Sequence, residues 1–126
     1  MAWLRLQQPS AARVRLLLDA ADRRERTLFI NIVNLGEVFY LSVRDRDLAY
    51  GRRVLVTLRS RVTTISADDD LVLFAASLKA TNPISYADAF AAATALLRDL
   101  PLVTGDPELK AMARKEKSLK LEWIGA

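Results

Sequence analysis

The chain has 126 residues, enough for one domain, and its 52% hydrophobic and 27% charged residues are typical of a globular protein. It contains no cysteine and no histidine, which excludes zinc fingers, cysteine nucleophiles, Ser-His-Asp triads and any histidine general base. An enzyme built from this sequence must use carboxylates, hydroxyls, lysine or arginine, or a metal ion held by oxygen ligands.

The net charge of +4 is unevenly distributed. Residues 1–67 carry twelve arginines and six acidic residues, whereas residues 68–126 carry seven basic and nine acidic residues. One interpretation of the basic half is a polyanionic partner, because arginine binds phosphate well, and the other is a solvated, arginine-rich surface. The sequence shows no signal peptide and no apolar run of the ~20 residues that a membrane helix needs, so we expect a cytoplasmic protein.

Helical and strand patterns alternate along the chain. In order, they predict a helix from a Ser10 cap to Ala21, a strand over Leu28–Ile32, a helix over Val33–Arg46, a helix from an Asp47 cap to Ser60 and a strand over Val62–Ile65. They then predict a helix over Asp69–Ala80 capped by Ser66 or Asp68, a helix from a Ser85 cap to Asp99, a strand over Leu102–Thr104, a helix to about Lys117 and a strand over Leu119–Ile124. Strands separated by helices indicate a mostly parallel sheet with helices on both faces, whose ligands bind at the carboxyl ends of the strands.

Two carboxylates fall in apolar surroundings near the starts of predicted helices. Glu37 lies one turn into the helix that follows the first predicted strand, and the alternative is an exposed glutamate favoured by the helix dipole. Asp88 precedes a stripe of small residues formed by Ala91, Ala92 and Ala95, where a carboxylate is costly without a cation. The alternative for Asp88 is a capping box with Ser85, three residues earlier.

A third carboxylate, Asp106, directly follows the strand over Leu102–Thr104 and Gly105. The alternative is a simple helix cap before Pro107, and Glu108 is either an auxiliary acid or a helix N-terminal charge. Carboxylates gathered at one sheet edge repel one another, and a divalent cation such as Mg²⁺ or Mn²⁺ relieves that repulsion. Such a site supports metal-assisted hydrolysis of a phosphodiester by water.

At these residues the sequence resembles the PIN domain, specifically the VapC-type ribonuclease toxins of toxin–antitoxin pairs. The resemblance covers nearly the whole chain and is carried by Ile32-Val-Asn-Leu-Gly-Glu-Val-Phe-Tyr40, Pro83-Ile-Ser-Tyr-Ala-Asp-Ala-Phe-Ala-Ala92 and Pro101-Leu-Val-Thr-Gly-Asp-Pro107. It implies a three-layer α/β/α sandwich in which Glu37, Asp88 and Asp106 bind Mg²⁺ or Mn²⁺ and act in RNA cleavage. Thr104 matches a hydroxyl often found beside the last acid, and Asn34 and Glu108 are further auxiliary candidates. The resemblance also implies a homodimer and a cognate antitoxin.

The chain departs from this family at its start. A PIN domain begins with a central strand that ends in a metal-binding aspartate, whereas here no aspartate precedes Asp19. The segment Met1–Leu6 looks like the helix that follows that strand, so we expect a single PIN-like domain over residues 1–126 that lacks the first strand and its aspartate. Two unpaired strand edges would then face each other at the middle of the sheet.

The leading hypothesis is therefore a Mg²⁺- or Mn²⁺-dependent endoribonuclease that acts as a toxin. The second is a catalytically degenerate PIN-like module that binds RNA or protein, and the absent first aspartate favours it. A flavodoxin-like regulatory domain is a weaker third hypothesis, because the usual early acidic pair is absent. Arg44 shares a helix face with Glu37 and Tyr40, so it is a candidate for contact with RNA or antitoxin, the alternative being a solvated arginine.

Overall fold

The computed structural model describes residues 2–4 and 18–125. Its strands are β1 (Ala2–Leu4), β2 (Leu28–Asn31), β3 (Thr63–Ile65), β4 (Leu102–Thr104) and β5 (Leu121–Trp123). Its helices are α2 (Ile32–Asp45), α3 (Leu48–Arg61), α4 (Asp69–Thr81), α5 (Tyr86–Arg98) and α6 (Pro107–Lys115). Residues 18–22 are also helical, as expected for the end of the first predicted helix, whose earlier part lies outside the described residues. The alternation of helices and strands from Leu28 onward is thus confirmed.

The five strands form one sheet in the order β3-β2-β1-β4-β5, and every neighbouring pair is parallel. The expectation that the first strand is missing was wrong, because Ala2–Leu4 forms β1 at the centre of this sheet. Trp3 is in register with Phe29 of β2 on one side and with Leu102 of β4 on the other. The other strands are also only three or four residues long, and three residues are too few to show a strand period in the sequence.

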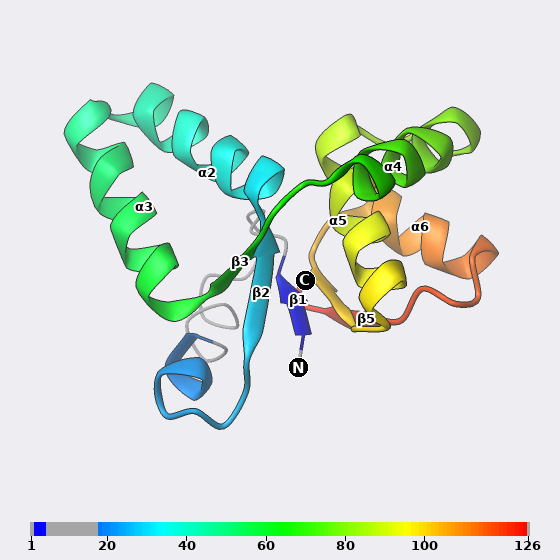
Figure 1. Cartoon of the computed structure of the whole chain (residues 1–126), viewed down its shortest axis with the longest axis horizontal. Coiled ribbons are helices and arrows are strands. Elements are labelled where there is room, and N and C mark those ends of the chain that lie inside the picture. Colours follow the sequence, from blue (N-terminus) through cyan, green and yellow to red (C-terminus); the bar gives the residue numbers. More distant parts are fainter. Residues whose placement is uncertain (1, 5–17, 126) are drawn as a thin grey trace.

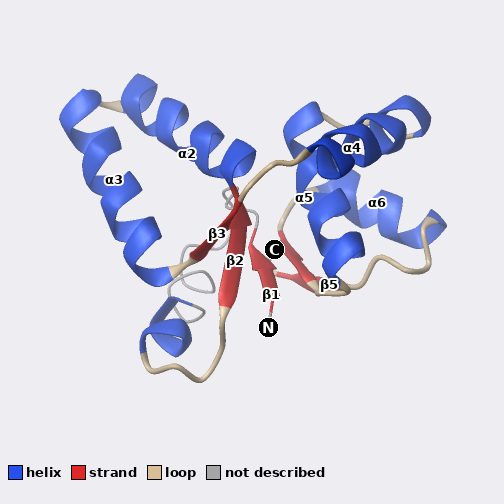
Figure 2. Cartoon of the chain, viewed as in Figure 1, coloured by secondary structure: helices blue, strands red, loops and turns tan. Residues whose placement is uncertain are grey.

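The helices lie to both sides of the sheet, and α2 and α3 form an arm that points away from α4, α5 and α6 (Figures 1 and 2). Helix α5 packs against β1, β2 and β4, and α4 packs against α5. The stripe of small residues explains this close approach, since Ala89, Ala91, Ala92 and Ala93 are fully buried. Leu28 and Ile30 of β2, Ile65 of β3, and Leu102 and Val103 of β4 are among the buried residues of the core.

Side-chain caps fix where the helices begin. The cap residues, each accepting a hydrogen bond from a backbone N–H of the first turn, are Asn31, Asp47, Asp68, Ser85 and Asp106. The structure confirms the predicted caps Asp47 and Ser85. Of the two residues predicted for the helix over Asp69–Thr81, Ser66 and Asp68, the cap is Asp68. Asn31 ends β2 one residue earlier than predicted, because its side chain begins α2 directly from the strand.

The topology brings several of these helix starts to one edge of the sheet. Helix α2 starts at the carboxyl end of β2, and two residues separate the carboxyl end of β4 from the start of α6. Helix α5 precedes β4 in a parallel crossover, so its first turn also lies toward this edge. The edge therefore collects polar side chains from three helix N-termini, where backbone N–H groups and helix dipoles favour anionic groups.

Candidate metal centre

Asp88 lies in the first turn of α5 and is 2% exposed. The Ser85 hydroxyl accepts a hydrogen bond from the Asp88 backbone N–H at 3.1 Å, so the capping spacing seen in the sequence is a true helix cap. That cap involves the backbone of Asp88 and leaves its carboxylate to take part in a separate cluster. Burial next to the alanine-rich face of α5 agrees with the crowded environment that the sequence predicted.

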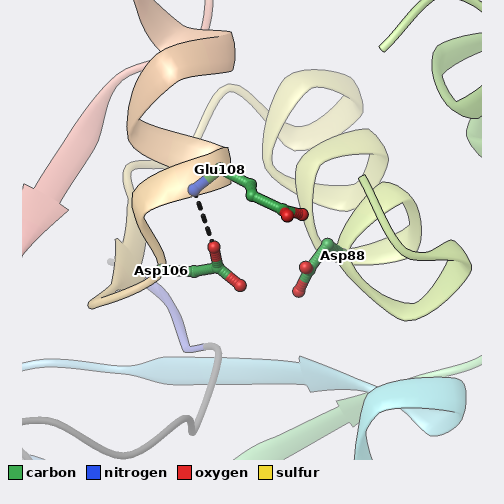
Figure 3. Close-up of side chains that lie close together, drawn as sticks. All are labelled: Asp88, Asp106 and Glu108. Atoms are coloured by element: carbon green, nitrogen blue, oxygen red, sulfur yellow. Dashed lines mark hydrogen bonds between the residues drawn. The ribbon is translucent and has the colours of Figure 1, made fainter. Parts of the chain in front are cut away.

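Asp106 caps α6 and is held by two short hydrogen bonds. Its carboxylate accepts from the Glu108 backbone N–H at 2.8 Å, and its own N–H donates to the Thr104 hydroxyl at 3.1 Å. Thr104 is fully buried at the carboxyl end of β4. The helix-cap alternative for Asp106 is therefore correct, and the same geometry also directs the Asp106 side chain toward Asp88 (Figure 3).

Asp88, Asp106 and Glu108 form an acidic cluster in which one carboxylate oxygen from each lies within 4.8 Å of the others (Figure 3). Burial raises the pKa of Asp106 above its ordinary value, and the nearby charges of Asp88 and Glu108 raise it further, against the lowering effect of the Glu108 N–H. Three carboxylates at this separation repel one another. The donor set is all oxygen, which fits a hard divalent cation such as Mg²⁺ or Mn²⁺.

The acidic cluster does not reproduce the predicted ligand set in full. Glu108, expected only as an auxiliary acid, is its third member, whereas Glu37 is outside the group of three. Glu37 lies on α2, partly buried, with its Oε1 shielded from solvent. It follows Asn34 by one helical turn, and the Asn34 amide donates to the Ala87 carbonyl of α5 at 2.8 Å. Glu37 is thus on the part of α2 that faces the Asp88 turn.

Two buried polar residues, Asn31 at the end of β2 and Thr94 within α5, escaped the sequence analysis. Asn31 and Thr94 are both buried and joined by a 3.1 Å hydrogen bond from the Asn31 amide to the Thr94 hydroxyl. The Thr94 hydroxyl in turn donates to the Phe90 carbonyl within α5. Nothing in the sequence distinguished these residues from surface polar residues; only the position of Asn31 immediately after a buried strand offered a signal.

The central strand contributes no carboxylate to this edge. β1 ends at Leu4, between β2 and β4, and the sequence has no acidic residue before Asp19. Asp19 belongs to the helical segment 18–22, which precedes β2 in the chain. The first strand is therefore present, and the sequence places no aspartate at its carboxyl end.

Arg44 and one cavity lie outside the acidic cluster. Arg44 is exposed near the end of α2, with its guanidinium carbon 5.9 Å from the centre of the Tyr40 ring. A cavity of about 540 Å³ lies between the sheet, the start of α4 and the end of α5, and its lining includes Phe29, Asp68 and Arg98. The residues that line it do not include any member of the acidic cluster.

The chain is an α/β protein with an all-parallel five-stranded sheet and acidic residues at one edge of it. A comparison with protein families identifies which α/β family it belongs to. The model of the PIN domain family matches residues 1–115, and the chain belongs to that family. A search of curated proteins found no match. The resemblance stated from the motifs is thereby confirmed.

Solved structures share this fold across almost the whole chain. A chain of the DNA-bound VapBC structure from Salmonella typhimurium is 17% identical, with a TM-score of 0.71 and coverage of 98% of both chains. A chain of VapBC2 from Rickettsia felis, bound to a DNA fragment from its promoter, is 18% identical, with a TM-score of 0.69 and coverage of 97% of this chain and 98% of that one. FitAcB from Neisseria gonorrhoeae gives 17% identity, a TM-score of 0.63 and 96% coverage of both chains. Within the described residues, no helix is long and apolar enough to cross a membrane.

Proposed function

We propose that this protein is a Mg²⁺- or Mn²⁺-dependent endoribonuclease and the toxin of a toxin–antitoxin pair. The observation that carries the proposal is the acidic cluster of Asp88, Asp106 and Glu108 at the carboxyl edge of a PIN-domain sheet. Nuclease activity is what membership of this family implies. Beyond nuclease activity, we propose Mg²⁺ or Mn²⁺ as the metal and RNA as the substrate.

The residues of the cluster have distinct tasks in this proposal. Asp88 and Asp106 would hold the cation, with Glu108 and Glu37 as further oxygen donors, and Thr104 would keep Asp106 in place through its 3.1 Å hydrogen bond. When bound, a divalent cation supplies Lewis-acid stabilisation of the phosphodiester and favours deprotonation of an attacking water. Burial raises the pKa of Asp106, and the charges of Asp88 and Glu108 raise it further, a repulsion that a bound cation would offset.

Contacts to partners would come from other surfaces of the chain. The structural neighbours include complexes named VapBC, so we propose a cognate antitoxin as a protein partner and a homodimer as the assembled toxin. Arg44, exposed on α2 together with Tyr40, is the residue we propose for contact with RNA phosphates or with an antitoxin carboxylate. The cytoplasm, where RNA is accessible, is the proposed location.

One observation favours a second function, a catalytically degenerate PIN-like module that binds RNA or protein without cutting. The carboxyl end of central strand β1 is the middle of the edge, and the sequence supplies no carboxylate there. A site with fewer carboxylates holds a cation more weakly, since each charged ligand adds to the attraction.

RNA cleavage with Mn²⁺ or with EDTA separates the two functions. The variant Asp88→Asn removes one cluster carboxylate, and Asp70→Asn is the matched control because Asp70 is an exposed aspartate in the first turn of another helix. Mn²⁺-dependent cleavage that is lost in Asp88→Asn and kept in Asp70→Asn supports the nuclease. RNA binding by the folded protein without cleavage supports the degenerate module instead.

A further inference from the structure

Two buried side-chain hydrogen bonds connect the start of α2 to α5. Asn34 donates from Nδ2 to the Ala87 carbonyl at 2.8 Å, and Asn31 donates from Nδ2 to the Thr94 hydroxyl at 3.1 Å. The Asn31 carboxamide oxygen also accepts from the Asn34 backbone N–H at 2.7 Å, which fixes Asn34 on the first turn of α2. All three side chains are at most 1% exposed. Hydrogen bonds between polar side chains and α5 therefore form part of this contact, at positions where apolar side chains would have no polar atoms to satisfy.

Asn34 has a second unusual property. Its Oδ1 is buried and makes no hydrogen bond within the described part of the chain. Burying an acceptor without a donor costs free energy, and a leucine of similar size would fill the same volume without that cost. Ala87 immediately precedes Asp88, so the Asn34 side chain reaches the turn of α5 that carries this member of the acidic cluster. A hydrated divalent cation keeps several waters, and those waters are donors.

We propose that Asn34 is a positioning residue that fixes the Asp88 turn of α5 against the Glu37 turn of α2. It acts through the Ala87 carbonyl, and its Oδ1 is the acceptor for a water of the cation's hydration shell. This inference rests on the proposed function for its metal-binding part only. The positioning part does not depend on a cation, because the hydrogen bonds of Asn34 and Asn31 join protein groups only.

The test compares Asn34→Leu with Thr94→Val. Each variant removes one buried side-chain hydrogen bond between the start of α2 and α5, but Thr94 lies six residues further along α5 than Asp88. Asn34→Ser is the second variant, to be used if the leucine does not fold. Full-length proteins are measured in two ways: hydrogen exchange of α5 amides without metal, and Mn²⁺ affinity by calorimetry.

In the exchange experiment, Asn34→Leu is expected to speed exchange of the Asp88 and Ala89 amides, both of which hydrogen-bond to Ser85, relative to each variant's global unfolding rate. Thr94→Val should leave these amides as in the parent protein. In the affinity experiment, Asn34→Leu is expected to weaken Mn²⁺ binding by about tenfold or more, the usual effect of a residue that orients metal ligands, and Thr94→Val by less than about twofold.

The two readouts fail separately. Equal exchange at Asp88 and Ala89 in the two variants would overturn the positioning role whatever the metal does. Normal Mn²⁺ affinity in a folded Asn34 variant would overturn the role of Oδ1. Absence of Mn²⁺ binding in the parent protein would refute the proposed metal-dependent function and, with it, the role of Oδ1, while the exchange data would still decide whether Asn34 holds the Asp88 turn.

Discussion

Replacing Asp88 by asparagine is expected to stabilise the metal-free protein, although it removes a buried residue from a candidate active site. The three carboxylates of the acidic cluster lie within 4.8 Å of one another. At that distance two unit charges repel by about 0.9 kcal/mol at the permittivity of water and by about 3.5 kcal/mol at an effective permittivity of about 20. Because Asp88 is buried and Asp106 is partly buried, the true value lies between these limits.

We therefore expect Asp88→Asn to raise the free energy of unfolding by about 1–2 kcal/mol at pH 7.5 in EDTA and low salt, after allowance for hydrogen bonds that the carboxylate makes better than the amide. The gain should shrink as the pH falls. Asp106 has a raised pKa, so between its unfolded-state and native-state values the native protein binds a proton that the unfolded chain does not. Protonation of Asp106 on acidification thus stabilises the parent protein and removes the repulsion that the variant relieves.

Addition of Mn²⁺ is expected to reverse the order of stability. A cation that binds only the native state stabilises the parent by about 2.7 kcal/mol at a concentration of 100 times its Kd. The variant has lost a ligand and gains less. Urea unfolding followed by circular dichroism, with and without Mn²⁺, measures all four free energies, and Asp70→Asn controls for the loss of any carboxylate. The reasoning is refuted if Asp88→Asn is equally destabilising in EDTA and in Mn²⁺.

Three further predictions concern the rest of the fold. Gly51→Ala should lower the free energy of unfolding by about 1–3 kcal/mol in urea, because the new Cβ would collide with the Val43 side chain where α3 packs on α2. An unchanged unfolding midpoint would show that α2 and α3 can move apart at no cost. A double-mutant cycle on Arg26 and Glu122, which form a bidentate, partly buried ion pair at 2.8 and 3.1 Å, should give a coupling of about 1 kcal/mol, and no coupling would contradict the geometry. Arg44→Glu should weaken RNA binding and flatten its dependence on salt, as measured by fluorescence anisotropy, whereas equal salt slopes would remove Arg44 from the RNA surface.

The sequence predicted those features that depend on residues close together in the chain, such as helix caps. Ser85 and Asp68 are cap residues that precede apolar periodic segments, so their helices could be placed within a residue or two. Asp106 was identified because an aspartate between a strand and a proline is both a cap and a strand-end acid. These features require only neighbours in sequence, and the alternation they produce was enough to predict a parallel sheet.

What the sequence did not reveal depends on contacts between distant segments. β1 is stable only because β2 and β4 pair with it on both sides. The three residues of β1 alone do not indicate that these strands pair with them. The roles of Asn31 and Thr94 depend on a hydrogen bond across 63 residues of chain. The third member of the acidic cluster was ranked below Glu37 because spacing along the sequence does not give the distance between two helix N-termini.

The central position of β1 has a consequence for the order in which the protein assembles during synthesis. Trp3 pairs with Leu102, so about a hundred residues must leave the ribosome before the middle of the sheet can close. Asp106 and Glu108 follow that pairing by a few residues, and Asp88 meets them only once β4 is in place. A growing chain therefore carries no complete acidic cluster until Glu108 has been added and has left the ribosome.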